Sequence, residues 1–220
     1  DNQYLVTIQA DDGTNQSTQE VLVDITDVNE APSFSSGDSS LQNENTTTTG
    51  YVAAATDPEG ATLTYSIPNT GADQGKFNID PTTGTLTFLT PPDAENPTDA
   101  DGQNDYVVDI QVSDGQNTSV QTVTVDVSDI NEAPEFDNTN TLSIAEGATS
   151  PTLQASVTDP EGDSITWSIV GGADLSKFGI SSSGELSLNA AQDFENPQDG
   201  NTDNQYLVTI QADDGTNQST

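Results

Sequence analysis

The sequence predicts an all-β protein built from tandem Greek-key β-sandwich modules of about seven strands each. Three observations predict this fold: short runs in which apolar and polar residues alternate, turn-forming residues between those runs, and an internal repeat of about a hundred residues. No stretch has a helical period long enough to compete with the strands. Since a sandwich of this kind usually has about a hundred residues, each repeat is expected to be one module.

The clearest strand is YVVDIQV, residues 106–112, in which Tyr106, Val108 and Ile110 fall on one face. This period of two is typical of a half-buried strand. Residues 119–129 alternate in the same way through their valines, and the polar and glycine residues between the two runs predict a hairpin turn. Earlier strands of the same module are expected within residues 51–56, 62–67, 76–80 and 84–90.

The first residues of the chain repeat this hairpin. Six apolar residues at alternate positions are expected to face inward: Tyr4, Val6, Ile8, Val21, Val23 and Ile25. The other strands of the module to which this hairpin belongs are not within the sequence. We therefore expect the hairpin to pack against a neighbouring copy of the chain or against sequence outside this stretch.

The chain also repeats over longer distances. TDPEG stands at residues 56–60 and again at residues 158–162, an offset of 102 residues. The segment DNQYLVTIQADDGTNQST occupies residues 1–18 and returns unchanged at residues 203–220, an offset of 202 residues or two modules. Self-similarity of this kind indicates an array of homologous modules.

DVNEAP at residues 27–32 and DINEAP at residues 129–134 mark the predicted linkers between modules. Either copy alone would indicate a turn, since Asp and Asn bond to their own backbone and Pro fixes φ. Three domains are predicted on this basis: the last two strands and linker of one module in residues 1–31, a complete module in residues 32–133, and a module without its last strand in residues 134–220. We expect the sequence to be a window from a longer array.

The composition excludes several classes of protein. The chain has 37 Asp and Glu residues against two Lys and Arg residues, for a net charge of −35, which repels nucleic acid and anionic lipid. It has no Cys, Met or His, so disulfides, thiol or imidazole catalysis and the usual zinc ligands are excluded. No run of 18 apolar residues predicts a membrane span, and no signal peptide is expected within this stretch.

We do not expect an enzyme. The carboxylates of Asp93 and Glu95 could imitate the acid and nucleophile of a glycosidase, but the pair recurs in the next module and no aromatic-lined cleft is evident. No nucleophile, general base or cofactor motif stands out, so no catalytic residue is predicted.

The order of the motifs resembles a cadherin repeat, in the bacterial cadherin-like form found in large secreted or surface proteins. FNIDPTTGTL, residues 77–86, is similar to the family's F-x-I-D-x-x-T-G-x-L. VTVDVSDINEAP, residues 123–134, resembles the family's last strand and linker, V-T-V-x-D-x-N-D-N-x-P. The resemblance covers the whole chain. It implies a cadherin-like or Ig-like sandwich with calcium bound where successive modules meet.

The resemblance also implies which residues would hold the calcium. They are the glutamate near the first strand, the two acids of the family's D-R-E motif, the linker acids and asparagine, the two acids of TDPEG, and the aspartate of the late D-G turn. In this sequence they are Glu44, Asp93, Glu95, Asp27, Asn29, Glu30, Asp57, Glu59 and Asp114, and in the next repeat Glu146, Asp193, Glu195, Asp129, Asn131, Glu132, Asp159, Glu161 and Asp214. Both linkers are one residue shorter than the family form, which leaves two and three ions per junction both open.

The acids themselves indicate a cation. If the fold brings them together, the second junction collects eight carboxylates, from Glu44, Asp93, Glu95, Asp129, Glu132, Asp159, Glu161 and Asp214. One pair of like charges costs roughly 4 kcal/mol at about 4 Å and an effective dielectric constant of about 20. Several such pairs would exceed the roughly 5–15 kcal/mol that stabilises a domain. Calcium suits such a site, because it accepts six to eight oxygen ligands in flexible geometry, whereas magnesium demands a near-ideal octahedron.

A further acidic loop follows the D-x-E-N-P motif of each repeat. It contains Asp99, Asp101 and Asp105 in one copy and Asp199, Asn201 and Asp203 in the other. Alternating oxygen donors are typical of a calcium loop, but the bidentate Glu expected at its twelfth position is missing. An extra ion and a solvated turn rich in Asp, Asn and Gly both remain open.

The function predicted from these features is structural. Calcium at the junctions would rigidify a long extracellular array, such as an adhesin stalk or fibre at a cell surface, with neighbouring modules or copies of the chain as partners. The alternative is a calcium-dependent binding module that recognises a polysaccharide or another cadherin-like array.

Overall fold

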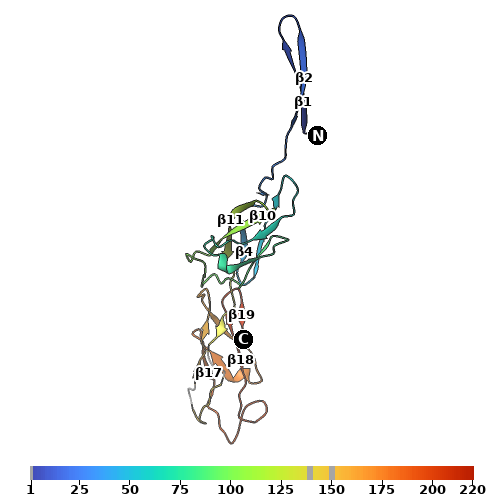
Figure 1. The fold of residues 1–220 in the computed structure, drawn as a ribbon. Helices are drawn as coiled ribbons and strands as arrows, with labels where there is room; N and C mark the ends of the chain where they lie inside the picture. The colour runs from blue at the N-terminus through green and yellow to red at the C-terminus, as the bar shows by residue number, and fades with distance from the viewer. Residues whose placement is uncertain (1, 138–140, 149–151) are drawn as a thin grey trace. The chain divides into compact units, whose positions relative to one another are not determined.

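The computed structural model describes residues 2–137, 141–148 and 152–220, and nearly all of its regular structure is β-strand (Figure 1). The chain forms two compact units, Asp1–Ser128 and Asp129–Thr220, and each is described by itself. None of the helices in the described ranges is long and apolar enough to span a membrane. The module boundaries at residues 31 and 133 remain predictions.

The first unit contains two main sheets and the elements β1 (Gln3–Asp11), β2 (Gln16–Asp24), β3 (Ser33–Phe34), β4 (Ser39–Asn43), β5 (Thr48–Val52), β6 (Ala55–Thr56), β7 (Thr64–Ser66), the 3₁₀ helix η1 (Gln74–Lys76), β8 (Phe77–Ile79), β9 (Thr85–Phe88), β10 (Asp105–Ser113) and β11 (Thr118–Ser128). One sheet has the order β4-β11-β10-β7 and the other the order β5-β9-β8. Strand β11 is parallel to β4 and antiparallel to β10. The prediction of an all-β sandwich is confirmed.

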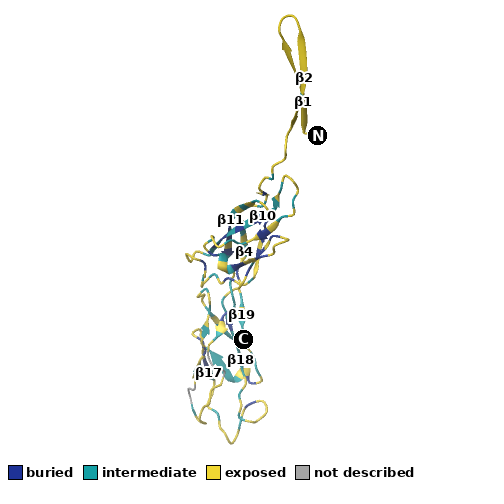
Figure 2. Cartoon of the chain, viewed as in Figure 1, coloured by how far each residue is buried: buried dark blue, intermediate teal, exposed yellow. Residues whose placement is uncertain are grey.

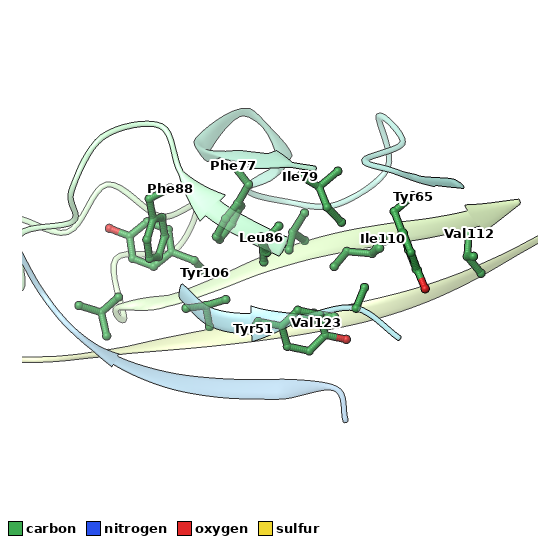
Figure 3. Packing of buried hydrophobic residues seen from close by; sticks show 14 residues of the cluster. Tyr51, Tyr65, Phe77, Ile79, Leu86, Phe88, Tyr106, Ile110, Val112 and Val123 are labelled. Atoms are coloured by element: carbon green, nitrogen blue, oxygen red, sulfur yellow. The ribbon is translucent and has the colours of Figure 1, made fainter. Parts of the chain in front are cut away.

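The core of this unit lies between the two sheets (Figure 3). Along β10 buried and half-buried residues alternate strictly, as predicted, and Tyr106, Val108 and Ile110 are at most 1% exposed. The ring of Phe88 stacks on that of Phe77 with centroids 4.8 Å apart and meets Tyr106 edge-on at 5.2 Å. Such aromatic pairs stabilise a core beyond the area that they bury.

The turn before β9 explains the glycine of the FNIDPTTGTL motif. Gly84 has a φ of +70°, and a Cβ atom there would lie 2.4 Å from the carbonyl oxygen of Ala53. Its own backbone N–H donates to Asp80 O at 2.9 Å, and its carbonyl accepts a bond from Ala53 N at 2.8 Å. Only glycine therefore lets this turn approach the facing strand.

The first hairpin differs from the prediction. Strands β1 and β2 pair over nine residues with Tyr4 opposite Val23 and Val6 opposite Val21, but the apolar face is not buried. Tyr4, Val6, Ile8, Val23 and Ile25 are 43–61% exposed and Val21 is half-buried, so the expectation that all six face inward is wrong. Figure 2 shows the hairpin almost wholly exposed, whereas buried and half-buried residues alternate along β10 and buried residues also occur in β11. A hairpin alone has no second sheet to cover its apolar face.

The second unit repeats the sandwich in a more open form. Its elements are β12 (Glu135–Phe136), β13 (Thr152–Gln154), β14 (Val157–Thr158), β15 (Thr166–Gly171), the 3₁₀ helix η2 (Leu175–Lys177), β16 (Phe178–Ile180), β17 (Glu185–Leu188), β18 (Thr209–Asp213) and β19 (Gln218–Ser219). The sheets have the orders β15-β18-β19 and β13-β17-β16. Trp167, Phe178 and Ile210 are only half-buried, whereas Leu186 and Ala212 are buried.

Candidate metal centre

The first unit gathers acids around the linker that precedes its sandwich. We call Asn29, Glu30, Asp57, Glu59 and Asp114 the linker cluster. The Nδ2 group of Asn29 donates to Asp114 Oδ2 at 2.6 Å and to the carbonyl oxygen of Glu30 at 3.1 Å. The bond to Asp114 fastens the linker to the turn between β10 and β11.

Asp114 is held in its charged form. Its Oδ1 atom accepts the backbone N–H groups of Gln116 and Asn117, each at 2.6 Å. The bond from Asn117, then that from Gln116, lowers the pKa of Asp114 below its usual value, and the amide of Asn29 lowers it further. The carboxylate is therefore ionised at neutral pH.

Asp57 has one carboxylate oxygen fixed and one without a donor. Its Oδ1 atom accepts the backbone N–H groups of Glu59 at 3.1 Å and Ala61 at 2.9 Å, which is the Asp-Pro-Glu-Gly turn expected from the sequence. Its Oδ2 atom is buried and has no hydrogen-bond partner in the described part of the chain. A buried carboxylate oxygen without a donor is costly unless a cation faces it.

Glu59 and Glu30 lie against each other. Glu59 Oε2 accepts the backbone N–H of Glu30 at 3.3 Å. The pKa of Glu59 is raised, first because its carboxyl group forms a hydrogen bond with that of Glu30, and further by burial and by the negative charges of Glu30 and Asp57. At neutral pH the cluster therefore concentrates negative charge that a metal ion or a proton would relieve.

The second unit builds the same arrangement. Asn131 Nδ2 donates to Asp214 Oδ2 at 3.0 Å and to the carbonyl oxygen of Glu132 at 2.9 Å. Asp159 Oδ1 accepts the N–H of Asp163 at 2.8 Å, while Asp159 Oδ2 and both carboxylate oxygens of Glu161 are buried without a hydrogen-bond partner among the described residues. The free oxygen of Asp57 thus recurs at the equivalent Asp159.

Three further predicted ligands form a separate group in each unit. In the first unit Glu44, Asp93 and Glu95, here called the carboxylate triplet, place one oxygen each within 4.8 Å of the others. Glu44 is 2% exposed, and its Oε2 atom accepts the N–H of Ala94 at 2.7 Å. Its backbone N–H donates to Ser128 O at 3.0 Å, so the triplet lies beside the last residue of β11.

The second unit repeats the carboxylate triplet with Glu146, Asp193 and Glu195. Glu146 Oε2 accepts the N–H of Phe194 at 3.1 Å, which is the counterpart of the bond from Ala94. All three acids of this copy are exposed. The first linker acids, Asp27 and Asp129, are also exposed.

The acidic loop of the first unit brings together Asp99, Asp101 and Asp105, with one oxygen of each within 4.8 Å of the others. Burial of Asp99 acts to raise its pKa, but hydrogen bonds from Gln103, Asp101 and Asn104 lower it overall. The pKa of Asp101 is raised, chiefly by its hydrogen bond with Asp99. Asp105 Oδ1 is buried and without a partner among the residues described.

The loop of the second unit is similar in backbone but not in charge. Asp199 accepts the N–H groups of Asp203 at 2.9 Å and Asn204 at 3.3 Å, as Asp99 does from the equivalent positions. Asn201, however, donates its Nδ2 group to Asp203 Oδ2 at 2.9 Å. Its amide therefore donates a hydrogen bond to that carboxylate, where the first unit has a third carboxylate, that of Asp101.

Two buried aspartates that the sequence reasoning missed hold these loops in place. Asp73 is 4% exposed and accepts the N–H groups of Ala100 at 2.7 Å and Val107 at 2.8 Å. Asp174 accepts those of Gly200 at 2.7 Å and Leu207 at 2.9 Å. The signal in the sequence is the repetition of GAD before each Lys-Phe pair.

Two asparagines were missed as well. Asn117 Nδ2 donates to the carbonyl oxygen of Asn29 at 2.8 Å, and Asn217 Nδ2 donates to that of Asn131 at 2.6 Å. Each therefore ties the linker asparagine to the same turn that carries the aspartate of the linker cluster.

Comparison with known proteins shows what the modules are similar to. A family described as bacterial Ig domain matches residues 29–127. Protocadherin-15 of Homo sapiens is 40% identical over 113 residues, which are 49% of this chain and 5% of that protein. Protocadherin Fat 4 of Homo sapiens is 28% identical over 210 residues, which are 88% of this chain and 4% of that protein. These matches support a cadherin-like or Ig-like repeat.

A solved structure gives the same fold. The crystal structure of human protocadherin-24 EC1-2 superposes with a TM-score of 0.50 and 23% sequence identity, covering 84% of this chain and 88% of that one. The chain spans only a small part of the length of the curated relatives that it matches. The comparisons therefore describe its cadherin-like modules and not a whole protein.

Proposed function

We propose that these modules form a calcium-binding structural repeat region, in which calcium at the junctions stiffens an extracellular array such as an adhesin stalk or a fibre. The observation that carries this proposal is the buried Oδ2 atom of Asp57 and of its counterpart Asp159, neither of which has a hydrogen-bond donor among the described residues. Among the described residues, the same oxygen is left without a partner in both compact units. Such an oxygen is stabilised when a cation faces it.

The donors favour calcium over other cations. The linker cluster and the carboxylate triplet offer carboxylate, amide and backbone carbonyl oxygens, and the chain has neither His nor Cys for a softer metal. Calcium accepts six to eight such oxygens at irregular angles, whereas magnesium retains its water ligands. Sites of this kind in extracellular modules bind calcium with dissociation constants of about 10⁻⁴–10⁻³ M.

The linker cluster contains the residues that lead into a module, and the carboxylate triplet lies beside the end of the module's last strand. The linker cluster of the first unit includes Asn29 and Glu30, which precede its sandwich, and the carboxylate triplet lies beside Ser128, at which its last strand ends. A linker that leaves a triplet therefore leads directly to the next linker cluster. Ions shared between these groups would convert binding free energy into a fixed angle between modules.

The acidic loop supports one additional ion in the first unit. Asp99, Asp101 and Asp105 converge there, and the buried Asp105 Oδ1 atom has no partner among the described residues. We expect Asp105→Asn to lower the number of bound calcium ions by one without changing the linker cluster. The second unit has Asn201 and Gln205 at the equivalent positions and serves as the natural comparison.

Calorimetric titration of the chain with calcium tests the proposal. We expect Asp57→Asn to weaken one class of calcium sites, because a neutral amide replaces the carboxylate that faces the ion, and Asp159→Asn to weaken the equivalent class in the second unit. The control is Asp80→Asn, which alters an exposed carboxylate already bonded to the N–H groups of Thr82 and Thr83. Equal effects of Asp57→Asn and Asp80→Asn would contradict the proposal.

A further inference from the structure

The chain contains five aspartates that are followed directly by glycine, and a pair of this kind can rearrange without an enzyme. The aspartates are Asp12, Asp101, Asp114, Asp199 and Asp214. In the rearrangement the backbone nitrogen of the glycine attacks the side-chain carboxyl carbon of the aspartate and closes a five-membered ring. Glycine favours ring closure because it has no Cβ atom to hinder the rotation of the backbone. The hydrogen bonds of the five pairs therefore decide where the reaction occurs in the folded chain.

In four of the Asp-Gly pairs a side-chain oxygen holds the backbone N–H of the glycine, at distances of 2.7–3.1 Å. The bonds run from Gly13 to Asp11, from Gly115 to Ser113, from Gly200 to Asp174 and from Gly215 to Asp213. Ring closure must turn the glycine nitrogen towards the carboxyl group before it, so each of these bonds has to break first.

The aspartates of the same four pairs are held as well. Each carboxylate accepts two backbone N–H groups, at distances of 2.6–3.3 Å. In Asp12, Asp114 and Asp214 the donors are the second and third residues after the aspartate. Because the carboxyl group has to turn and lose an oxygen during ring closure, these bonds also oppose the reaction.

The fifth pair, Asp101 and Gly102, is exposed in the acidic loop of the first unit. The N–H of Gly102 has no acceptor among the described residues. The second and third N–H groups after Asp101, those of Gln103 and Asn104, donate to Asp99 at 2.9 and 3.3 Å. No heavy atom lies within 4 Å of the place where a Cβ atom of Gly102 would stand. The glycine nitrogen of this pair can therefore turn towards the carboxyl group without breaking a hydrogen bond of its own.

The acidic loop of the second unit has no such pair. It has Asn201 and Thr202 where the first unit has Asp101 and Gly102. The β-branched side chain of Thr202 hinders the approach of its nitrogen to the side chain before it. The reactive pair is therefore particular to one of the two loops.

We propose that Asp101 is the site at which the folded chain converts aspartate to isoaspartate without an enzyme. The nitrogen of Gly102 bonds to Asp101 Cγ, the nitrogen loses its proton and the carboxyl group loses a hydroxyl, so one water molecule leaves and a succinimide forms. Water then adds to the former backbone carbonyl carbon and breaks its bond to the nitrogen. The product has one more methylene group in the loop backbone and an α-carboxylate in place of the side-chain carboxylate. The reaction needs only water and does not depend on the calcium proposal.

Mass spectrometry of peptides from the full chain, aged at physiological temperature and pH in a chelator, tests the proposal. Electron-transfer fragmentation distinguishes isoaspartate from aspartate at each position. We expect isoaspartate to form at Asp101 about tenfold faster than at each of the other four aspartates, since tenfold corresponds to about 1.4 kcal/mol, the order of one hydrogen bond. In denaturant, where these bonds are absent, all five rates should be similar. Equal rates in the folded chain, or the same excess at Asp101 in denaturant, would overturn the proposal.

Ageing in heavy-oxygen water checks the route. Opening of the succinimide puts one oxygen from water into residue 101, so isoaspartate without the label would overturn the proposal. The matched control is Asp101→Glu, which keeps the charge but would have to close a six-membered ring, and it should take up no label at this position. Because all steps are carried out in a chelator, failure here leaves the calcium proposal standing, and the reverse also holds.

Discussion

Asn29 Nδ2 donates a hydrogen bond to Asp114 Oδ2 at 2.6 Å, and Asn131 makes the equivalent bond to Asp214 at 3.0 Å. In each unit this bond joins the linker to a turn 83–85 residues further along the chain. It places an amide donor, and not a further acid, directly against an ionised carboxylate. The linker is therefore attached to the module that follows it even without a metal.

Replacing this amide tests its role. We expect Asn29→Asp to lower the free energy of unfolding in a chelator by about 1–3 kcal/mol, because a donor is lost and a second carboxylate faces Asp114. Calcium should restore part of the loss. The control is Asn78→Asp, which makes the same charge change at an exposed position of β8. Equal losses in both variants, measured by denaturant titration, would contradict the assignment.

The linker cluster also predicts a dependence on pH. The pKa of Glu59 is raised above 4.5, so its contribution to stability is fully present below about pH 4.5 and is lost as the pH rises through its folded-state pKa. We expect Glu59→Gln, which mimics the protonated form, to raise the melting temperature at pH 7 in a chelator and to change little below pH 4.5. In calcium at pH 7 the same substitution should weaken binding.

The contribution of Asp114 to stability should depend on pH in the opposite direction from that of Glu59. Its pKa is lowered from 3.8, so its contribution is present above that value and is lost as the pH falls through the folded-state pKa. Asp114→Asn should therefore destabilise the chain at pH 7 and have little effect at the lowest pH. The melting temperature of both variants is measured as a function of pH. If both substitutions raised it at pH 7, or both lowered it, the account of the cluster would be contradicted.

The hairpins β10–β11 and β1–β2 carry equivalent tyrosines that are buried to different extents, so replacing each by Ala should lower the free energy of unfolding by different amounts. Tyr106 is 1% exposed among Phe77 and Phe88, so Tyr106→Ala should destabilise the first sandwich by about 3–5 kcal/mol. Tyr4 occupies the equivalent strand position but is 61% exposed, so Tyr4→Ala should change stability by no more than about 0.5 kcal/mol. Similar losses in denaturant titrations would mean that the first hairpin is buried in solution.

Much of the fold could be predicted because its signals are local. The alternation in β10 and β11 gave both their pairing and their buried face, and the glycine at position 84 marked a tight turn. The exposure of Tyr4 and Val6 could not be predicted in the same way. Alternation indicates which residues share a face, but burial depends on whether another sheet covers it.

The candidate site was predicted residue by residue only through the resemblance to cadherin repeats. The sequence did not indicate that Asp57 has one oxygen fixed by backbone N–H groups and one without a donor, because that follows from the turn geometry. It also did not indicate Asp73 or Asn117, since residues that position a loop or linker carry no metal-ligand pattern. Asn201 was predicted as an oxygen donor, whereas its nitrogen faces Asp203.

Small-angle X-ray scattering of the chain in millimolar calcium and in a chelator tests the central claim most directly. In calcium we expect a scattering profile with a narrow distribution of distances between the two units of one chain. In the chelator we expect the broad distribution that a flexible linker gives. Asp159→Asn should weaken this response and Asp80→Asn should leave it unchanged. Identical profiles with and without calcium would contradict the claim that calcium fixes the junction.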